Sequence, residues 1–315
     1  TACVDASRQF FLDMIDTQVT ALGLEAKAGD DHLKKLLRAR LAGAAVVHGH
    51  PATVEEAKHI FANATRMAGL GPDEQSTVLK AVVRWGTEAD FAEVKRRYLA
   101  ATFAAEKKRL MYALAAARAT KLIDEVLNMA IGEAVRAQDT VSLLAAVARY
   151  DEGRSRAFTF IQQNWKLLDA RYGSGGFALT RLVLTASHFY TQEKLDEVAA
   201  FFQGHPVPAA ARAVARAEEE VGGAVAWVKE HAGAVCKWFT VNSSNRDTQN
   251  YKMSAGIQTA RSDEIMVTRA HGTCVSEVER PLRWGADRAT ADTICCFNRM
   301  YAERSGSWEQ TSFLR

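Results

Sequence analysis

The sequence predicts an all-α protein, a superhelical stack of antiparallel helices, over most of its 315 residues. Three observations support this prediction. The chain has only 5 prolines, and none of them lies between residues 73 and 205. Signals for the start of a helix recur at short intervals. The segments between those signals are short, and short connections make successive helices antiparallel neighbours.

The proline-free stretch is also poor in glycine, since only Gly132 lies between Gly86 and Gly153. It is rich instead in Ala, Leu, Arg, Lys and Glu, the residues that favour a helix most. We expect about ten to twelve helices of about 11 to 20 residues before Trp238. Pairs of such helices would stack as HEAT and armadillo repeats do, although no strict repeat period is visible.

Several helix starts can be placed from local chemistry. Thr53 and Glu56 have the pattern of a capping box, in which the threonine hydroxyl accepts from a backbone amide and the glutamate reaches back. Thr87 and Asp90 form a weaker version, because aspartate is shorter than glutamate. Pro72 suits the first turn of a helix.

Later helices are predicted in the same way. Apolar residues at three- and four-residue spacing would form one buried stripe: Phe158, Ile161, Trp165, Leu168 and Tyr172. Thr191 should cap the next helix, which ends at Gly204–Pro206. A last helix is expected from Pro208 to His231, weakened at Gly222–Gly223.

The character of the sequence changes after Trp238. We therefore divide the chain into a helical domain at 1–238 and a tail at 239–315. The tail lacks sustained helical periodicity, and Thr240–Asn245 has the composition of a linker. Short apolar pieces such as Ile265–Val267 could be β-strands. The fold of the tail stays unassigned.

Composition argues against several classes of protein. The 40 basic and 37 acidic residues nearly cancel, whereas a nucleic-acid-binding protein normally has a basic excess. No apolar run approaches the roughly 18 residues needed to span a membrane. The 5 cysteines are odd in number, so we expect no disulfide framework, a reducing compartment and a cytoplasmic location.

A series of short motifs is informative as a set. They are Gly29–His32, Leu36–Arg38, Thr53–Ala57, Glu106–Arg109, Val135–Ser142, Asn164–Trp165, Arg171–Tyr172, Gly175–Phe177, Arg181–Val183, Glu197–Val198, Phe201–Phe202 and His205–Pro206. In this order and spacing, residues 8–238 resemble the C-terminal helical domain of M1-family zinc aminopeptidases, specifically the puromycin-sensitive branch. The sequence departs from that family at Ala137, where a proline is expected.

The resemblance implies a function for a whole enzyme and a more limited one for this domain. M1 enzymes remove N-terminal residues from peptides with one zinc ion, and their helical domain closes over the catalytic domain to form a peptide chamber. Zinc peptidases of this type bind the metal through an H-E-x-x-H motif. None of the 8 histidines here is followed by Glu, and the family's G-x-M-E-N element is absent. We therefore expect a non-catalytic domain, inactive alone, with the zinc in a separate catalytic domain.

Two functions fit these observations. In the first, the chain is the peptide-chamber part of an M1-type aminopeptidase, and its partners are a peptide substrate and the catalytic domain. In the second, the helical stack is an interaction scaffold or assembly subunit without peptidase activity, and its partner is another protein. An H-E-x-x-H motif upstream of Thr1 in the native protein would favour the first function.

The turn after Tyr172 is the candidate substrate-binding site. It is surrounded by Arg171, Tyr172, Gly175, Gly176 and Arg181. As a peptide-facing loop, it could place an arginine against a substrate carboxylate. Alternatively, the glycines only let the backbone turn between two helices, and the arginine side chains are solvated.

Two other polar clusters are expected to be structural. Within Arg136–Asp139, the carboxylate of Asp139 would cap a helix. His48, His50 and His59 are close in sequence, but no thiol lies at metal-ligand spacing, so we expect a loop.

The tail holds weaker candidates for a metal site. His271 and Cys274 form an H-x-x-C pair, and Cys295 and Cys296 follow about twenty residues later. Adjacent cysteines point to opposite faces of a strand, which suits zinc poorly. We expect buried or idle thiols, with structural zinc and a reactive cysteine as alternatives.

Overall fold

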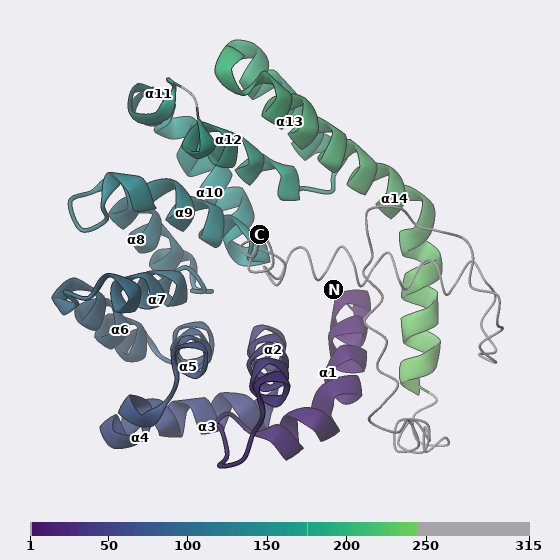
Figure 1. Ribbon diagram of the computed structural model, residues 1–315. Coiled ribbons are helices and arrows are strands. Elements are labelled where there is room, and N and C mark those ends of the chain that lie inside the picture. The colour runs from purple at the N-terminus through teal and green to yellow at the C-terminus, as the bar shows by residue number, and fades with distance from the viewer. Residues whose placement is uncertain (1, 175, 245–315) are drawn as a thin grey trace.

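The computed structural model describes residues 2–174 and 176–244, and the regular structure in this part of the chain is entirely helical (Figure 1). The all-α prediction is confirmed there. The helices are α1 (Ala2–Leu22), α2 (His32–His48), α3 (Pro51–Ala62), α4 (Ala64–Gly69), α5 (Pro72–Trp85), α6 (Glu88–Ala100), α7 (Ala104–Leu114), α8 (Thr120–Ile131), α9 (Ala137–Ala148), α10 (Asp151–Gln163), α11 (Trp165–Tyr172), α12 (Phe177–Leu184), α13 (Gln192–Gly204) and α14 (Ala211–Ser244), with two short 3₁₀ helices, η1 (Thr185–His188) and η2 (Pro208–Ala210).

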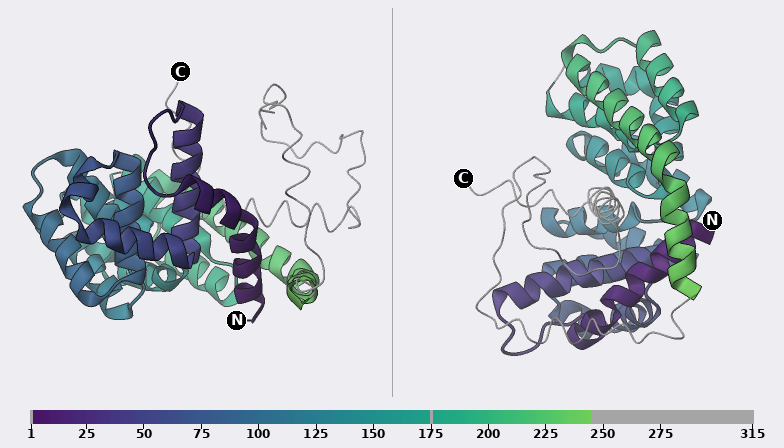
Figure 2. Two further views of the ribbon diagram at one scale, coloured as in Figure 1. Left: turned by 90° about the horizontal axis from the view of Figure 1, so that it is seen from below. Right: turned by 90° about the vertical axis from the view of Figure 1, so that its right-hand side faces the viewer.

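The helices follow one another around a ring (Figure 1). Each packs on near neighbours in the chain, as α6 does on α7 and α9 does on both α8 and α10. Helix α14 then runs back along one side of the molecule and packs on α1 (Figure 2). The ring is closed at this contact, which brings the first and the last described helices together.

One large apolar core runs through the stack from Leu24 to Val221. Its fully buried side chains include Phe91 and Phe158, and burial of each such side chain contributes about 1.5–3 kcal/mol to folding. A separate small cluster joins α1 to α2 and consists of Leu12, Ile15, Val19 and Ala45. Helix α1 is therefore attached to the stack by a core of its own.

Three of the predicted helix starts are confirmed. Pro72 is the first residue of α5. At the start of α6, the Thr87 hydroxyl accepts from the Asp90 amide at 3.2 Å, and the Asp90 carboxylate accepts from the Thr87 amide at 2.7 Å. At the start of α13, the Thr191 hydroxyl accepts from the Lys194 amide at 3.4 Å.

The capping box predicted at Thr53 was wrong. Helix α3 begins at Pro51, and its cap is His50, whose ring nitrogen Nδ1 accepts from the Thr53 amide at 3.3 Å. Proline is well suited to the first position of a helix, so the helix starts before the threonine. Glu56 instead forms an ion pair with Arg66.

Fourteen α-helices lie within the described residues, more than the ten to twelve expected. Two asparagines account for part of the difference, because Asn63 separates α3 from α4 and Asn164 separates α10 from α11. The side chain of Asn164 donates to the backbone carbonyl of Phe160 at 2.9 Å. The predicted apolar stripe is therefore shared between two helices, and its residue Tyr172 is only half-buried.

Helix α14 is longer than the sequence indicated. It passes through Gly222–Gly223 and continues beyond His231 to Ser244, so most of the predicted linker at Thr240–Asn245 is helical. Beyond α14, residues 245–315, and with them most of the proposed tail, lie outside the described residues. None of the described helices is both long enough and apolar enough to cross a membrane.

The expectation that the cysteines stay unpaired was wrong for two of them. Cys3 in α1 forms a disulfide with Cys236 in α14, with a Cα–Cα distance of 5.1 Å. An odd number of cysteines excludes only a complete pairing, and a separation of 233 residues gives no local signal. The contact exists because the ring brings α14 back to α1.

Candidate functional site

The side chains around the predicted substrate-binding turn contact the end of α8 and the first half of α9. Both terminal nitrogens of Arg171 donate to the carbonyl of Ile131, the last residue of α8, at 3.4 Å. The Tyr172 hydroxyl donates to the carbonyl of Ala137 at 2.6 Å. Arg181 donates to the hydroxyl of Ser142 at 3.1 Å. These bonds fix α11 and α12 on the preceding helix pair.

The turn itself combines a special backbone conformation with exposed side chains. Gly176 has a φ of 88°, a left-handed conformation that favours glycine, whereas Gly175 lies outside the described residues. Arg171 and Arg181 remain exposed beside it. Phe177, which begins α12, is 96% exposed. Both interpretations of the turn, as a peptide-facing loop and as a helix junction, therefore remain compatible with its geometry.

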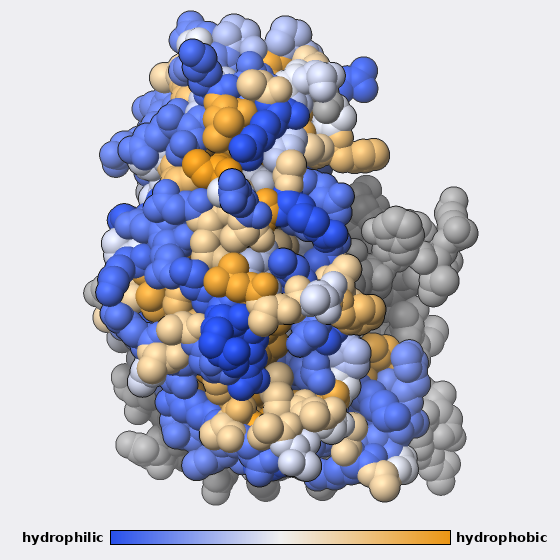
Figure 3. Space-filling model, turned by 90° about the vertical axis from the view of Figure 1, so that its left-hand side faces the viewer, coloured by the Kyte–Doolittle hydropathy of each residue, from blue (hydrophilic) through white to orange (hydrophobic). Residues whose placement is uncertain are grey.

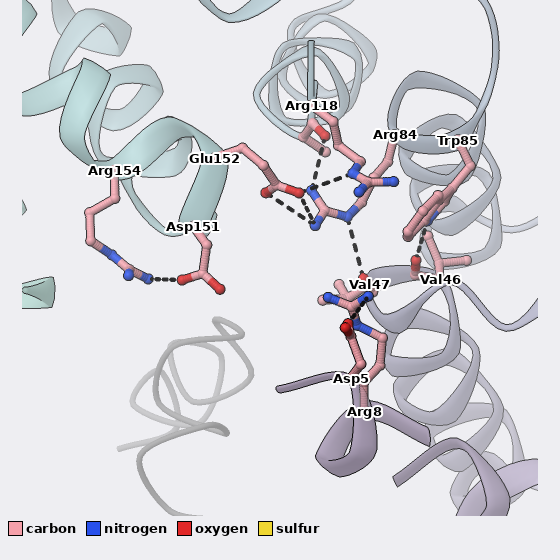
Figure 4. Close-up of polar contacts among 11 residues, drawn as sticks. Asp5, Arg8, Val46, Val47, Arg84, Trp85, Arg118, Asp151, Glu152 and Arg154 are labelled. Atoms are coloured by element: carbon pink, nitrogen blue, oxygen red, sulfur yellow. Dashed lines mark hydrogen bonds and ion pairs between the residues drawn. The ribbon is translucent and has the colours of Figure 1, made fainter. Parts of the chain in front are cut away.

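A network that the sequence analysis missed lies where α5, α10 and the turn between α7 and α8 meet (Figure 4). Arg84 at the end of α5 donates to both carboxylate oxygens of Glu152 in α10, at 3.1 and 3.2 Å. Arg118 donates to the same carboxylate at 3.0 Å. Burial alone would raise the pKa of Glu152, but the charge of Arg84, a backbone hydrogen bond, and the bond to Arg118 and its charge hold that pKa below its ordinary value.

The same network contacts the end of α2. The indole nitrogen of Trp85 donates to the carbonyl of Val46 at 2.6 Å, and Arg84 donates to the carbonyl of Val47 at 3.3 Å. The Arg118 guanidinium lies 4.0 Å from the centre of the Trp85 ring, a distance that allows a cation–π contact. Four segments are therefore joined by one set of polar side chains.

Two further ion pairs flank this network. Arg154 is 5% exposed and bonds Asp151 at 2.7 Å within α10, while Arg8 lies 3.6 Å from Asp5 within α1. His48 is buried nearby, with its ring centre 4.5 Å from that of Phe11. Each of the arginines drawn in Figure 4 has a carboxylate partner, so the cluster is close to electrically balanced.

Only part of this network could be recognised from the sequence. The helix that ends in Arg84 and Trp85, and the acidic start of α10, can both be recognised locally. Their partnership cannot, because Arg84 and Glu152 are separated by 68 positions.

Two of the resemblance motifs meet in space, which the sequence also could not indicate. Asp139, from the motif Val135–Ser142, is buried and bonds Arg136 at 2.8 Å. Lys108, from the motif Glu106–Arg109, lies 3.9 Å from Asp139. Asp139 is not the cap of α9, because that position is occupied by Arg136. The cluster also includes Tyr98, whose hydroxyl donates to the carbonyl of Ala134 at 2.8 Å. The cap position predicted for Asp139 was therefore wrong.

Comparison with known proteins adds the decisive observation. Residues 1–222 match the family described as the ERAP1-like C-terminal domain. The chain belongs to this family. The resemblance proposed from the motifs is therefore confirmed.

Curated relatives of this ERAP1-like domain are aminopeptidases. Aminopeptidase M1-B of Oryza sativa subsp. japonica is 28% identical over 228 residues, which cover 70% of this chain and 26% of that protein. Aminopeptidase M1 of Arabidopsis thaliana is 29% identical over 229 residues, with the same coverage of 70% and 26%. Glutamyl aminopeptidase of Sus scrofa is 26% identical over 235 residues, which cover 73% of this chain and 25% of that protein. The chain thus spans about a quarter of the length of these relatives.

The loop expected around three histidines was wrong, because His48 ends α2, His50 caps α3 and His59 lies within α3. His50 contacts the Thr53 hydroxyl at 2.8 Å through Nδ1 and Asp16 at 2.9 Å through Nε2. No group of three His, Cys, Asp or Glu side chains that could hold a metal ion occurs in the part of the chain that the structure describes. The tail candidates His271, Cys274, Cys295 and Cys296 lie outside that part.

A groove of about 370 Å³ lies between α6 and α8 on the outer face of the ERAP1-like domain. It is lined by Glu88, Phe91, Ala92, Lys95, Arg96, Leu99, Lys121, Leu122 and Glu125. Lys95 bonds Glu125 at 2.5 Å, and Lys121 bonds Glu88 at 3.3 Å. On this side of the molecule, hydrophobic and hydrophilic residues are interspersed (Figure 3). The lining has three basic and two acidic side chains, so no single sign of charge specifies a ligand for the groove.

Proposed function

We propose that this chain is the non-catalytic, peptide-chamber domain of an M1-type zinc aminopeptidase whose full-length form removes N-terminal residues from peptides. The observation that carries the proposal is a combination: residues 1–222 match the ERAP1-like C-terminal domain, and the sequence has no H-E-x-x-H motif. The relatives are aminopeptidases, and the chain corresponds to about a quarter of each. The catalytic zinc would belong to the part of such an enzyme that this chain does not include.

Within this proposal, the ring of helices forms the wall of the chamber, and the turn between α11 and α12 binds peptide. Arg171 and Arg181 would pair with a peptide carboxylate, because a guanidinium group suits bidentate binding. Tyr172, Gly175 and Gly176 would set the shape of the turn. The network of Arg84, Arg118 and Glu152 would keep the wall rigid.

We also propose that the protein works in the cytoplasm, on the basis of its odd cysteine count. In a reducing compartment, the bond between Cys3 and Cys236 would form only transiently. The protein would then act on peptides, together with a catalytic domain, in a reducing compartment.

Hydrolysis assays and metal analysis of this polypeptide alone test whether the catalytic zinc lies outside this chain. We expect no hydrolysis of an N-terminal-residue chromogenic amide and no bound catalytic zinc. Turnover that a chelator abolishes would contradict the proposal, because it would require a metal site in this chain. Zinc that is bound without turnover, and is lost in Cys274→Ser, would instead indicate a structural site in the tail.

Peptide binding tests the role of the turn. Fluorescence anisotropy would compare one labelled peptide with a free C-terminal carboxylate and the same peptide as its amide. We expect Arg181→Ala to weaken binding of the carboxylate form about tenfold, or about 1.4 kcal/mol, and to leave the amide unchanged. The matched control is Arg212→Ala, an exposed arginine of α14. Equal effects of the two changes would reject the turn as the carboxylate site and favour the scaffold function.

A further inference from the structure

We propose that Cys3 and Cys236 form a redox-sensitive latch that holds the ring of helices closed. The proposal concerns the contact between α1 and α14, which includes the disulfide and the aromatic side chains beside it. It does not depend on the proposed peptidase function, because the same contact would close the ring of an interaction scaffold.

The far half of α14 lies beyond the large core. Val221 is the last residue of α14 among the buried members of that core. Further along the helix, Val235 and Phe239 are buried as well, although they are not part of the large core. Phe10 of α1 lies edge-on to Trp238 and Phe239, with ring centres 5.2 and 5.6 Å apart. Helix α1 is therefore the described helix that covers this half of α14.

Helix α1 contributes no buried residue to the large core. Its buried residues Leu12, Ile15 and Val19 pack with Ala45 of α2 in the separate small cluster. The contact between α1 and α14 thus joins two elements at the margin of the stack. Loosening this contact would leave the large core from Leu24 to Val221 intact.

The disulfide can be opened by ordinary thiol exchange. Both cysteines are partly exposed, so a small thiol such as glutathione can reach them. Its thiolate attacks one sulfur and forms a mixed disulfide, and the other cysteine leaves as a thiolate and takes up a proton. A second small thiol then resolves the mixed disulfide. In sum, two small thiols are oxidised to one disulfide while Cys3 and Cys236 are reduced to thiols.

The two states differ in how firmly the ends of the ring are joined. When oxidised, the bond links residues 233 positions apart, so α14 cannot leave α1. When reduced, the contact is held by the aromatic and apolar side chains alone. Local opening then becomes easier at α1 and the far half of α14, while α5 to α9 keep their protection.

Hydrogen exchange on the full chain, measured by mass spectrometry in glutathione buffers of varied ratio, tests the latch. The oxidised chain should yield a linked Cys3–Cys236 peptide after digestion without reductant. On reduction, we expect amide exchange in residues 2–22 and 225–244 to accelerate at least tenfold, with no change in α5 to α9. Cys3→Ser and Cys236→Ser should show the fast exchange in every buffer, whereas Cys274→Ser should respond like the natural sequence.

Three outcomes would overturn the latch. They are the absence of the linked peptide in oxidising buffer, unchanged exchange at α1 and α14 after reduction, and equal acceleration in all helices. If the serine variants fail to fold, the titration of the natural sequence with glutathione still makes each of these comparisons.

Discussion

Arg84 donates to both carboxylate oxygens of Glu152, at 3.1 and 3.2 Å, although the two residues are 68 positions apart. The Arg84 side chain is only 9% exposed, and that of Glu152 is 28% exposed. This pair joins the end of α5 to the start of α10 and is shared by Arg118. It ties the third quarter of the helical stack to the first half.

Glu152→Gln should therefore destabilise the protein substantially. The change keeps the shape of the side chain but leaves the buried Arg84 guanidinium without its counter-charge. Breaking one partner of such a pair costs about 2–4 kcal/mol in the free energy of unfolding. Urea unfolding followed by circular dichroism would measure the loss.

The matched control is Lys121→Gln. Lys121 pairs with Glu88, but these side chains are 76% and 67% exposed. We expect a loss below about 0.5 kcal/mol, because solvent screens an exposed ion pair. A loss as large as that of Glu152→Gln would contradict the prediction that burial makes an ion pair contribute more to stability.

The stability of the protein should fall between pH 6.5 and pH 4, in part because of His48. Burial, together with the charges of Arg8 and Arg84, lowers the pKa of His48 to about 4, against a small opposing effect of Asp151. In the unfolded chain the ring protonates near pH 6.5. Across this window the unfolded state binds more protons than the folded state, so acidification favours unfolding.

The His48 contribution should be visible in a variant. At pH 4 it amounts to at most about 3 kcal/mol relative to neutral pH. His48→Gln should flatten the slope of unfolding free energy against pH between 6.5 and 4. Urea titrations at pH 7, 5.5 and 4.5 would measure the slope, and an identical slope in the variant would show that other groups cause the loss.

The helical class and several helix starts could be predicted because they depend on neighbouring residues. The starts at Pro72, Thr87 and Thr191 follow from interactions within three positions. Where two local signals compete, the sequence alone does not decide, as the choice of His50 over Thr53 shows.

The parts that could not be predicted depend on how helices distant in the sequence pack together. The contacts of Arg84 with Glu152 and of Cys3 with Cys236 join segments whose spacing carries no periodic signal. The turn after Tyr172 was predicted correctly as a connection between two helices, but the bond of Arg171 to Ile131 depends on the neighbouring helix pair.

Gly49→Ala should be strongly destabilising. Gly49 ends α2 with a φ of 76°, and an added Cβ would lie 2.7 Å from the Trp85 ring. That ring is held by its bond to the Val46 carbonyl, so it cannot move away freely. Left-handed strain and overpacking together should cost about 2–4 kcal/mol.

Gly43→Ala is the control for this change, and thermal melting would compare the two variants. Gly43 lies in the same helix with open space around its Cβ position. Alanine is favoured over glycine in a helix by about 0.5–1 kcal/mol, so this variant should be more stable than the natural sequence. Destabilisation by both changes to the same extent would show that the Trp85 contact is not the cause.

His50 should matter more to the start of α3 than Thr53 does. Nδ1 of His50 accepts from the Thr53 amide, and Nε2 bonds Asp16 of α1 at 2.9 Å. His50→Ala removes the cap and this link to α1, at a cost of about 2 kcal/mol. His50→Asn should recover about half of the loss, because asparagine can cap a helix but is too short to reach Asp16. Urea unfolding would rank the variants, and a larger loss in Thr53→Ala than in His50→Ala would place the cap on the threonine after all.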